Sequence, residues 1–339
     1  MEEATRGSMR VNPRLLSLPG VFSLGLLLCF PLVQKDSKQK SIRVEVEMVS
    51  LPVVVMKRDG KHVADLQKED FRVFEDKVEQ KIEGFAAADE PFSVALMLDT
   101  SGSTMLKLER IQNEAIRFVN LLHSGDSVAV LSVAEDTRLL EDFTVARGRI
   151  ASAIRRTESG GATALYEAVW LALQEVLKPV RQRSALILFT DGVDTASEKA
   201  SKVETIELAK ESRAPIYCIY FNTQDEMQGT NRIPTPGERL PRMPGLGSST
   251  EDYMGGRQYL SNLADYSGGM VFDALRMEDL GLAFEAIAQQ LTSQYSIGYY
   301  PTNSKHDGKY RRVEVKVSRP GLYVQTRQGY FAPYDKKQK

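Results

Sequence analysis

The chain has 339 residues, 42% hydrophobic and 26% charged, so it can bury a full core and is too long for one minimal domain. Its 44 Lys and Arg residues nearly balance 45 Asp and Glu residues, and the formal net charge of -1 offers no basic footprint for nucleic acid. Three scattered histidines (His62, His123 and His306) leave little material for a His-rich zinc site or a Ser-His-Asp triad. Cys29 and Cys218 lie in apolar runs, which predicts no disulfide scaffold.

The N-terminal region, 1–41, has the layout of an export signal. Residues 15–33 are apolar and uncharged, Arg10 and Arg14 precede them, and the polar stretch 34–40 follows. We therefore expect a protein that leaves the cytoplasm and is either secreted or kept in the periplasm or cell envelope.

Two points about this region stay open. The prolines and glycine inside the apolar stretch disfavour a straight membrane-spanning helix, yet no small-x-small cleavage site is evident, so both a cleaved signal peptide and a retained anchor remain possible. Translation from Met9 rather than Met1 is favoured, because MRVNPR is the better basic start of a signal.

Short strands are expected on both flanks of the chain. Residues 42–86 alternate apolar and charged residues and contain the turn pair Asp59-Gly60. Residues 295–331 have the same character, with Asp307-Gly308 and Pro320-Gly321 as turns.

Between the flanks, residues 92–294 alternate apolar runs with amphipathic helices, which is typical of a parallel sheet covered on both faces. The expected strands are 93–98, 127–133, 185–190, 216–221 and 270–274, with 138–144 as an edge strand. Helical stripes of core residues are expected at Leu108, Ile111, Ala115, Phe118 and Leu122; at Leu165, Val169, Leu173 and Val176; and at Leu280, Phe284, Ile287 and Leu291. The Pro-, Gly- and Ser-rich stretch 222–257 is expected to be a surface insertion or mobile loop, with partner contact as an alternative.

The first central strand ends in an unusual pattern of oxygen-bearing side chains. Asp99, Ser101 and Ser103 alternate along the loop after the strand, and Gly102 permits a tight path between them. Ligands of open α/β sheets collect at the carboxyl ends of the strands, so these side chains are placed to converge on one point.

Two other loops are expected at the same edge. Thr163 follows two glycines just before a helix, and Asp191 ends another apolar strand. The five side chains supply only hard oxygen donors, which favours Mg²⁺, although Ca²⁺ or Mn²⁺ would also fit. Because Mg²⁺ takes about six oxygens, at least one position stays open for a carboxylate from elsewhere.

These residues carry a resemblance. DTSGST at 99–104, the Thr of GGAT and the Asp of FTDG resemble the metal-ion-dependent adhesion site of von Willebrand factor type A domains. The resemblance implies a Rossmann-like doubly wound domain, here 91–294, with Asp99, Ser101, Ser103, Thr163 and Asp191 as metal ligands. It also implies a non-enzymatic adhesion or interaction module that binds a protein ligand through a metal-bridged Glu or Asp.

The flanks resemble those of exported bacterial proteins of the acidobacterial type that carry a related A-type domain. The resemblance implies a small β-sandwich made of residues 42–90 and 295–334, followed by a charged tail at 335–339, with the A-type domain inserted into it. Asp76-Lys77 stands where that pattern has Asp-Gly, so the type of hairpin there is left open.

Rival interpretations of the same residues remain. Asp99 or either serine could cap the following helix. An Asp after a parallel strand also occurs in phosphoryl-transfer enzymes, although Ser101 stands where their second Asp would be, and no phosphate-binding loop or nucleophile elbow is present in the sequence. A metal that only fixes the loops is a further alternative.

Overall fold

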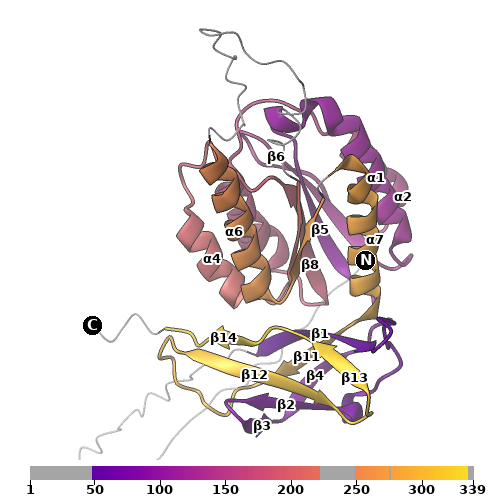
Figure 1. Ribbon diagram of the computed structural model, residues 1–339, viewed down its shortest axis with the longest axis vertical. Helices are drawn as coiled ribbons and strands as arrows, with labels where there is room; N and C mark the ends of the chain where they lie inside the picture. The colour runs from indigo at the N-terminus through magenta and orange to yellow at the C-terminus, as the bar shows by residue number, and fades with distance from the viewer. Residues whose placement is uncertain (1–47, 222–248, 275, 335–339) are drawn as a thin grey trace, which may run out of the picture. The chain divides into compact units, whose positions relative to one another are not determined.

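The computed structural model describes residues 48–221, 249–274 and 276–334 (Figure 1). The expected export segment, the tail and most of the expected insertion 222–257 lie outside these residues. Over the ranges that are described, no helix combines the length and apolar character needed to cross a membrane.

A six-stranded sheet forms the centre of the α/β region, in the order β10-β9-β8-β5-β6-β7. Its strands are β5 (Ser93–Asp99), β6 (Ser127–Val133), β7 (Arg138–Thr144), β8 (Ser184–Thr190), β9 (Ile216–Tyr220) and β10 (Met270–Asp273). All pair in parallel except β7, which runs antiparallel to β6 at one edge. Each strand lies within one residue of its expected ends, and the predicted fold class is confirmed.

Helices cover both faces of this sheet (Figure 1). One face packs against α1 (Leu108–Leu121), α2 (Arg147–Arg155) and α7 (Met277–Ser293). The other packs against α3 (Leu165–Leu171) with its π-helical continuation (Ala172–Leu177), α4 (Lys202–Glu211) and α6 (Thr250–Ser267). Since β5 is buried on both faces, its residues from Val94 to Leu98 are all apolar.

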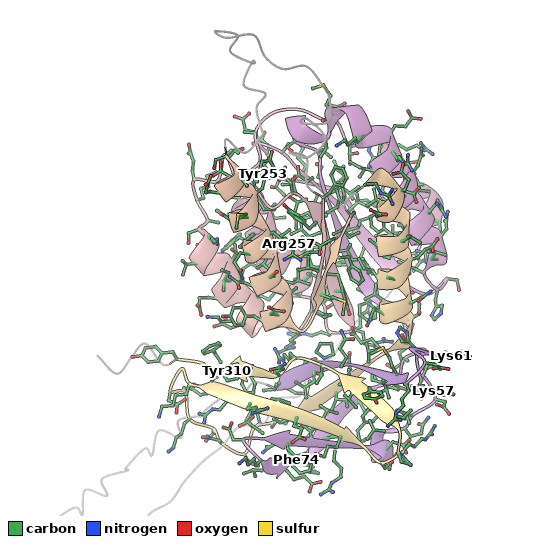
Figure 2. The ribbon with its side chains drawn as sticks, viewed as in Figure 1. Lys57, Lys61, Phe74, Tyr253, Arg257 and Tyr310 are labelled. Atoms are coloured by element: carbon green, nitrogen blue, oxygen red, sulfur yellow. The ribbon has the colours of Figure 1, made fainter. Side chains whose placement is uncertain are left out.

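The expected aliphatic stripes are buried in α1, α3 and α7, with Leu108 as the one member that stays partly exposed. The interpretation of 250–257 as part of an insertion was wrong, because these residues begin α6. Ser249 caps the helix, since its hydroxyl accepts a hydrogen bond from the Asp252 amide and its amide donates to the Asp252 carboxylate. Arg257 of α6, labelled in Figure 2, donates two hydrogen bonds to Asp273 at the end of β10.

The flanking residues form two antiparallel sheets that share one core. The first has the order β13-β1-β11-β4, with β1 (Val49–Lys57), β4 (Ile82–Ala86), β11 (Gln294–Tyr299) and β13 (Leu322–Gln325). The second has the order β14-β12-β2-β3, with β2 (Phe71–Glu75), β3 (Val78–Gln80), β12 (Tyr310–Val317) and β14 (Gly329–Phe331). Each sheet therefore contains strands from both flanks of the chain. The expected domain limits at 90/91 and 294/295 stay a prediction.

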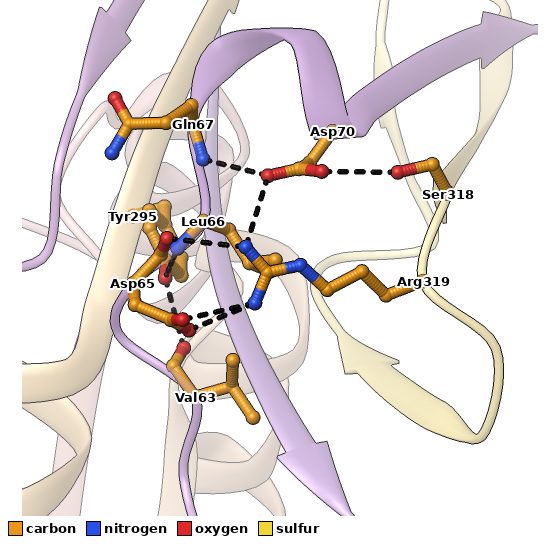
Figure 3. A network of polar contacts seen from close by, with 8 residues as sticks. All are labelled: Val63, Asp65, Leu66, Gln67, Asp70, Tyr295, Ser318 and Arg319. Carbon is orange, nitrogen blue, oxygen red and sulfur yellow. Dashed lines mark hydrogen bonds and ion pairs between the residues drawn. The ribbon is translucent and has the colours of Figure 1, made fainter.

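A polar network fixes the segment between β1 and β2 (Figure 3). The hydroxyl of Tyr295 accepts a hydrogen bond from the amide of Leu66 at 2.9 Å. Arg319 pairs with Asp65 at 3.0 Å and with Asp70 at 3.6 Å. The hydrogen bond from Arg319 lowers the pKa of the Asp65 carboxyl. These contacts join the short 3₁₀ helix Lys68–Asp70 to the turn after β12.

The hairpin between β2 and β3 turns through two residues, Asp76 and Lys77, whose φ angles are 46° and 73°. Two successive left-handed residues match the right-handed twist of the paired strands, as in a type I′ turn. The departure from Asp-Gly therefore leaves the hairpin intact and places a lysine in a conformation that favours glycine.

Candidate metal centre

Asp99 is the last residue of β5, at the carboxyl edge of the parallel sheet, and its side chain is fully buried. Its Oδ1 accepts a hydrogen bond from the Ser101 amide at 3.0 Å. Its Oδ2 accepts one from the hydroxyl of Thr190 at 2.6 Å. Both donors are neutral, so these bonds leave the negative charge of the carboxylate uncompensated.

Burial raises the pKa of Asp99, because the ionised carboxyl loses its contact with water. Hydrogen bonds from Thr190 and Ser101 act in the opposite direction without cancelling the effect. The carboxylate therefore lies where a cation would stabilise it most strongly.

Backbone hydrogen bonds join the loop after β5 to the loop that precedes α3. The amide of Gly160 donates to the Thr100 carbonyl at 2.9 Å, and the amide of Gly102 donates to the Gly161 carbonyl at 3.1 Å. The hydroxyl of Ser159 donates to the Ser101 carbonyl at 2.9 Å. Two loops that are about sixty residues apart in the sequence are thus held side by side.

Thr163 follows this second loop and is fully buried. Its amide donates to the hydroxyl of Thr195 at 2.8 Å, and its carbonyl accepts from the Thr195 amide at 2.9 Å. Its own hydroxyl, however, has no hydrogen-bond partner within the described part of the chain. A buried hydroxyl of this kind is uncommon and costly, and a bound cation would satisfy it.

Asp191 directly follows β8 and is 3% exposed. Its Oδ1 accepts a hydrogen bond from the Val193 amide at 3.0 Å. Gly192 turns the chain with a φ of 79°, and its backbone packs against Gly256 of α6. This close approach places the Asp191 loop against the first turns of α6.

Four of the five predicted ligands, Asp99, Ser101, Thr163 and Asp191, are therefore buried in loops that contact one another in a closed series. Ser103 belongs to the 3₁₀ turn Gly102–Lys107, and its side chain lies outside the described part of the structure. Their role as metal ligands stays a prediction.

Sequence reasoning missed three hydroxyl residues that shape this region. Thr190 binds Asp99 directly, Ser159 links two of the loops, and Thr195 holds the backbone of Thr163. The position of Thr190, at a strand end just before Asp191, was an available signal. The contacts of Ser159 and Thr195 depend on the tertiary fold.

The donor set fits a hard cation. Across the described ranges, no three His, Cys, Asp or Glu side chains group as a metal site. The buried charge of Asp99 and the unpartnered hydroxyl of Thr163 are both groups that a divalent ion would satisfy.

The doubly wound sheet, with polar loops at its carboxyl edge, defines the class: a Rossmann-like α/β domain. Residues 94–193 match the family model of the von Willebrand factor type A domain. The α/β region has the fold of that domain.

Similarity to individual proteins is low. The curated protein sll0103 of Synechocystis is 27% identical over 135 residues, which are 39% of this chain and 32% of that protein. The chain thus spans about a third of the length of this relative.

Three solved structures are similar to the chain at TM-scores below 0.5. A von Willebrand factor type A protein from Catenulispora acidiphila is 13% identical, with a TM-score of 0.47, and the match covers 86% of this chain and 75% of that one. BatB from Bacteroides thetaiotaomicron is 21% identical, with a TM-score of 0.44 over 59% of this chain and 97% of that one. Proximal thread matrix protein 1 of the mussel byssus, whose MIDAS motif holds zinc, is 16% identical, with a TM-score of 0.46 over 63% of this chain and 48% of that one.

Proposed function

We propose that this chain is an exported interaction module that holds Mg²⁺ at its strand-end site and uses the ion to bind an acidic side chain of a partner protein. The ligands are Asp99, Ser101, Ser103, Thr163 and Asp191, some of them acting through water. Ca²⁺ or Mn²⁺ would use the same oxygen atoms.

The pairing of Asp99 with Thr163 carries this proposal. Asp99 is a fully buried carboxylate with neutral hydrogen-bond donors, and Thr163 presents a buried hydroxyl without a protein partner. Each feature alone destabilises the fold. One dication beside both would compensate them together, and the hydrogen bonds between the loops already hold the two residues at the same edge of the sheet.

The binding role follows from the small number of ligands. Two carboxylates and three hydroxyls supply at most five of the roughly six oxygens that Mg²⁺ takes. An open position on an ion with few anionic ligands accepts a carboxylate from outside, and a Glu or Asp of a partner provides one.

Export is proposed from the apolar stretch 15–33 and its basic approach, which would place the module in the periplasm, in the cell envelope or outside the cell. We further propose that residues 42–90 and 295–334 form one β-sandwich domain around an inserted domain at 91–294. Each antiparallel sheet contains strands from both flanks, which supports this division.

The direct test is calorimetric titration of the metal-free protein with Mg²⁺, comparing Thr163→Val with Thr100→Val. Both threonines are buried, and they belong to loops that contact each other, but Thr100 donates its hydroxyl hydrogen bond to the Val133 carbonyl. We expect Thr163→Val to weaken Mg²⁺ binding at least about tenfold, whereas Thr100→Val keeps the affinity. Equal affinities in both variants would contradict the assignment of Thr163.

Partner binding is tested by a pull-down from envelope extract with Mg²⁺ and with EDTA, using Asp99→Ala as the control. A partner retained only by the wild-type protein with Mg²⁺ supports the proposal. Capture that survives both EDTA and Asp99→Ala would contradict it. The rival enzymatic function is tested by screening the protein with phosphoester and peptide substrates. Metal-dependent turnover that is lost in Asp99→Ala would show an enzyme and contradict the proposed binding role.

A further inference from the structure

A second polar site lies away from the candidate metal centre. A pocket of about 330 Å³ is bounded by the end of α4, by β14 and by the segment between β11 and β12. Residues 210–213, on its wall, lie just before the amino end of β9, whereas the candidate metal centre lies at the carboxyl ends of the strands. The two sites are therefore at opposite edges of the central sheet.

The lining of this pocket is basic. Its cationic side chains are Lys210, Arg213, Lys305 and Arg327, with His306 beside them, and its one acidic side chain is Glu211. Lys210 is already engaged, since it pairs with Glu207 at 2.6 Å and lies over the ring of Phe331. The remaining positive groups give the pocket a field that favours an anion.

Arg327 is the central observation. It is 6% exposed, it lines the pocket, and its Nε has no hydrogen-bond partner within the described ranges. Its guanidinium lies 5.7 Å from the centre of the Tyr330 ring, a contact that offers only a weak substitute for a counter-ion. Burial lowers the pKa of Arg327, as expected for a cation removed from water.

Two other buried arginines, Arg311 and Arg183, also have an Nε without a partner in the described ranges, but their terminal nitrogens are engaged. Arg311 is 5% exposed and donates to the Asp307 carboxylate at 2.8 Å. Arg183 is 7% exposed and donates to several backbone carbonyls. Arg327 is equally buried, but it makes no ion pair and no side-chain hydrogen bond with another residue of the described ranges. A buried cation without an anion is strongly unfavourable, so the pocket is incomplete as an isolated piece of protein.

We propose that this pocket binds a small molecule through a phosphate or carboxylate group, with Arg327 as the principal ligand. The planar fork of a guanidinium matches both groups with two parallel hydrogen bonds. Arg213, Lys305 and His306 also line the pocket, and the first two contribute positive charge. The site is independent of the proposed metal centre.

The test measures thermal unfolding of the full chain in increasing sodium phosphate and, separately, sodium acetate, each against sodium chloride at the same ionic strength. We expect a saturable rise in Tm with at least one of the two anions. A rise with phosphate identifies a phosphate group, and a rise with acetate identifies a carboxylate group. No saturable rise with either anion overturns the proposal.

Arg327→Gln should lose the rise, with affinity reduced about tenfold or more. The matched control is Arg319→Gln, which removes an arginine of the same β-sandwich that pairs with Asp65, outside the pocket. An unchanged anion response in Arg327→Gln would mean that the anion binds elsewhere, which also overturns the proposal.

If Arg327→Gln does not fold, the double variant Lys305→Gln and His306→Gln tests the site instead. Neither side chain is buried, so the substitutions leave the core intact. We expect several-fold weaker anion binding, with the loss shrinking as the ionic strength rises. Anion affinity equal to that of the wild-type protein would contradict the proposal.

Discussion

The guanidinium of Arg183 donates a hydrogen bond to the backbone carbonyl of Leu291, in the last turn of α7, at 3.1 Å. The same side chain donates to the carbonyl of Gln294, the first residue of β11, and to that of Ala87, which precedes β5. One buried cation thus joins the places where the chain enters and leaves the α/β region. Because β11 starts directly after α7 ends at Ser293, this contact lies at the junction of the helix and the strand.

Replacing Arg183 by Met should therefore destabilise the protein by roughly 2–4 kcal/mol, since several buried carbonyls lose a charged donor. Urea denaturation measures the free energy of unfolding. Arg181→Met is the control, because Arg181 is exposed two positions earlier in the same segment. A loss below about 0.5 kcal/mol, as for an ordinary surface substitution, would show that water satisfies these carbonyls equally well.

The central sheet was predictable because its strands are nearly continuous apolar runs, which follow from burial on both faces. The same logic identified α1, α3 and α7 from aliphatic stripes. It missed α6, whose first turns bury Tyr253 and Gly256 and whose aliphatic core residues, Leu260 and Leu263, come only in its second half. The start of the helix also adjoins a Pro- and Gly-rich stretch. Tertiary packing outweighs helix propensity there.

The site was predictable in part for the same reason. Asp99 and Asp191 each follow an apolar strand, so their place at the sheet edge follows from topology. The other contacts could not be predicted, because they depend on the path of loops that have no periodic pattern. Thr190 donates to Asp99, and Thr195 exchanges hydrogen bonds with the backbone of Thr163. The basic pocket at Arg327 also joins four segments of the chain, around residues 48–50, 210–213, 301–306 and 327–333, and no local sequence motif predicts it.

Asp99→Asn tests the charge of the candidate centre while keeping its shape. Without metal, we expect a free energy of unfolding within about 1 kcal/mol of the wild-type value, because the buried charge that is removed was unfavourable. Added Mg²⁺ should stabilise the wild-type protein by about 2.7 kcal/mol at a hundredfold excess over Kd, and the variant not at all. Denaturant titrations with Mg²⁺ and with EDTA measure both quantities. A large loss in metal-free Asp99→Asn would instead favour a structural role for the carboxylate.

The stabilisation by Mg²⁺ should increase with pH. Burial raises the pKa of Asp99, so in the metal-free protein the protonated form contributes stability that is present at low pH and is lost as the pH rises through this raised value. Metal binding needs the carboxylate and competes with the proton, so acid should abolish it. Melting temperatures with and without Mg²⁺ between about pH 4 and pH 8 provide the measurement. A difference independent of pH would mean that the ion binds away from Asp99.

Lys77→Gly should stabilise the hairpin between β2 and β3. Lys77 has a φ of 73°, which costs a residue with a side chain about 1–2 kcal/mol, and glycine adopts this conformation freely. The greater entropy of glycine in the unfolded chain offsets part of the gain, so we expect about 0.5–1 kcal/mol more stability in urea denaturation. Lys77→Ala, which keeps the strain, is the control and should show no gain.

Gly192→Ala tests whether α6 supports the candidate centre. A Cβ at Gly192 would lie 2.7 Å from the carbonyl carbon and oxygen of Gly256, and the φ of 79° is itself unfavourable for alanine. Because the obstacle is backbone rather than a flexible side chain, the loop with Asp191 or the helix must move. We expect a loss of roughly 2–4 kcal/mol in the free energy of unfolding, together with weaker Mg²⁺ binding.

Two substitutions in α6 complete this test. Gly256→Ala places its Cβ 2.7 Å from the backbone of Gly192 and should reproduce both effects from the opposite side of the contact. Gly255→Ala meets no atom within 4 Å and should stabilise the helix by about 0.5–1 kcal/mol without changing Mg²⁺ affinity. If Gly192→Ala and Gly256→Ala reduced stability but left Mg²⁺ binding intact, the position of Asp191 would not depend on α6. If all three variants behaved alike, the close contact between the two glycines would have no energetic consequence.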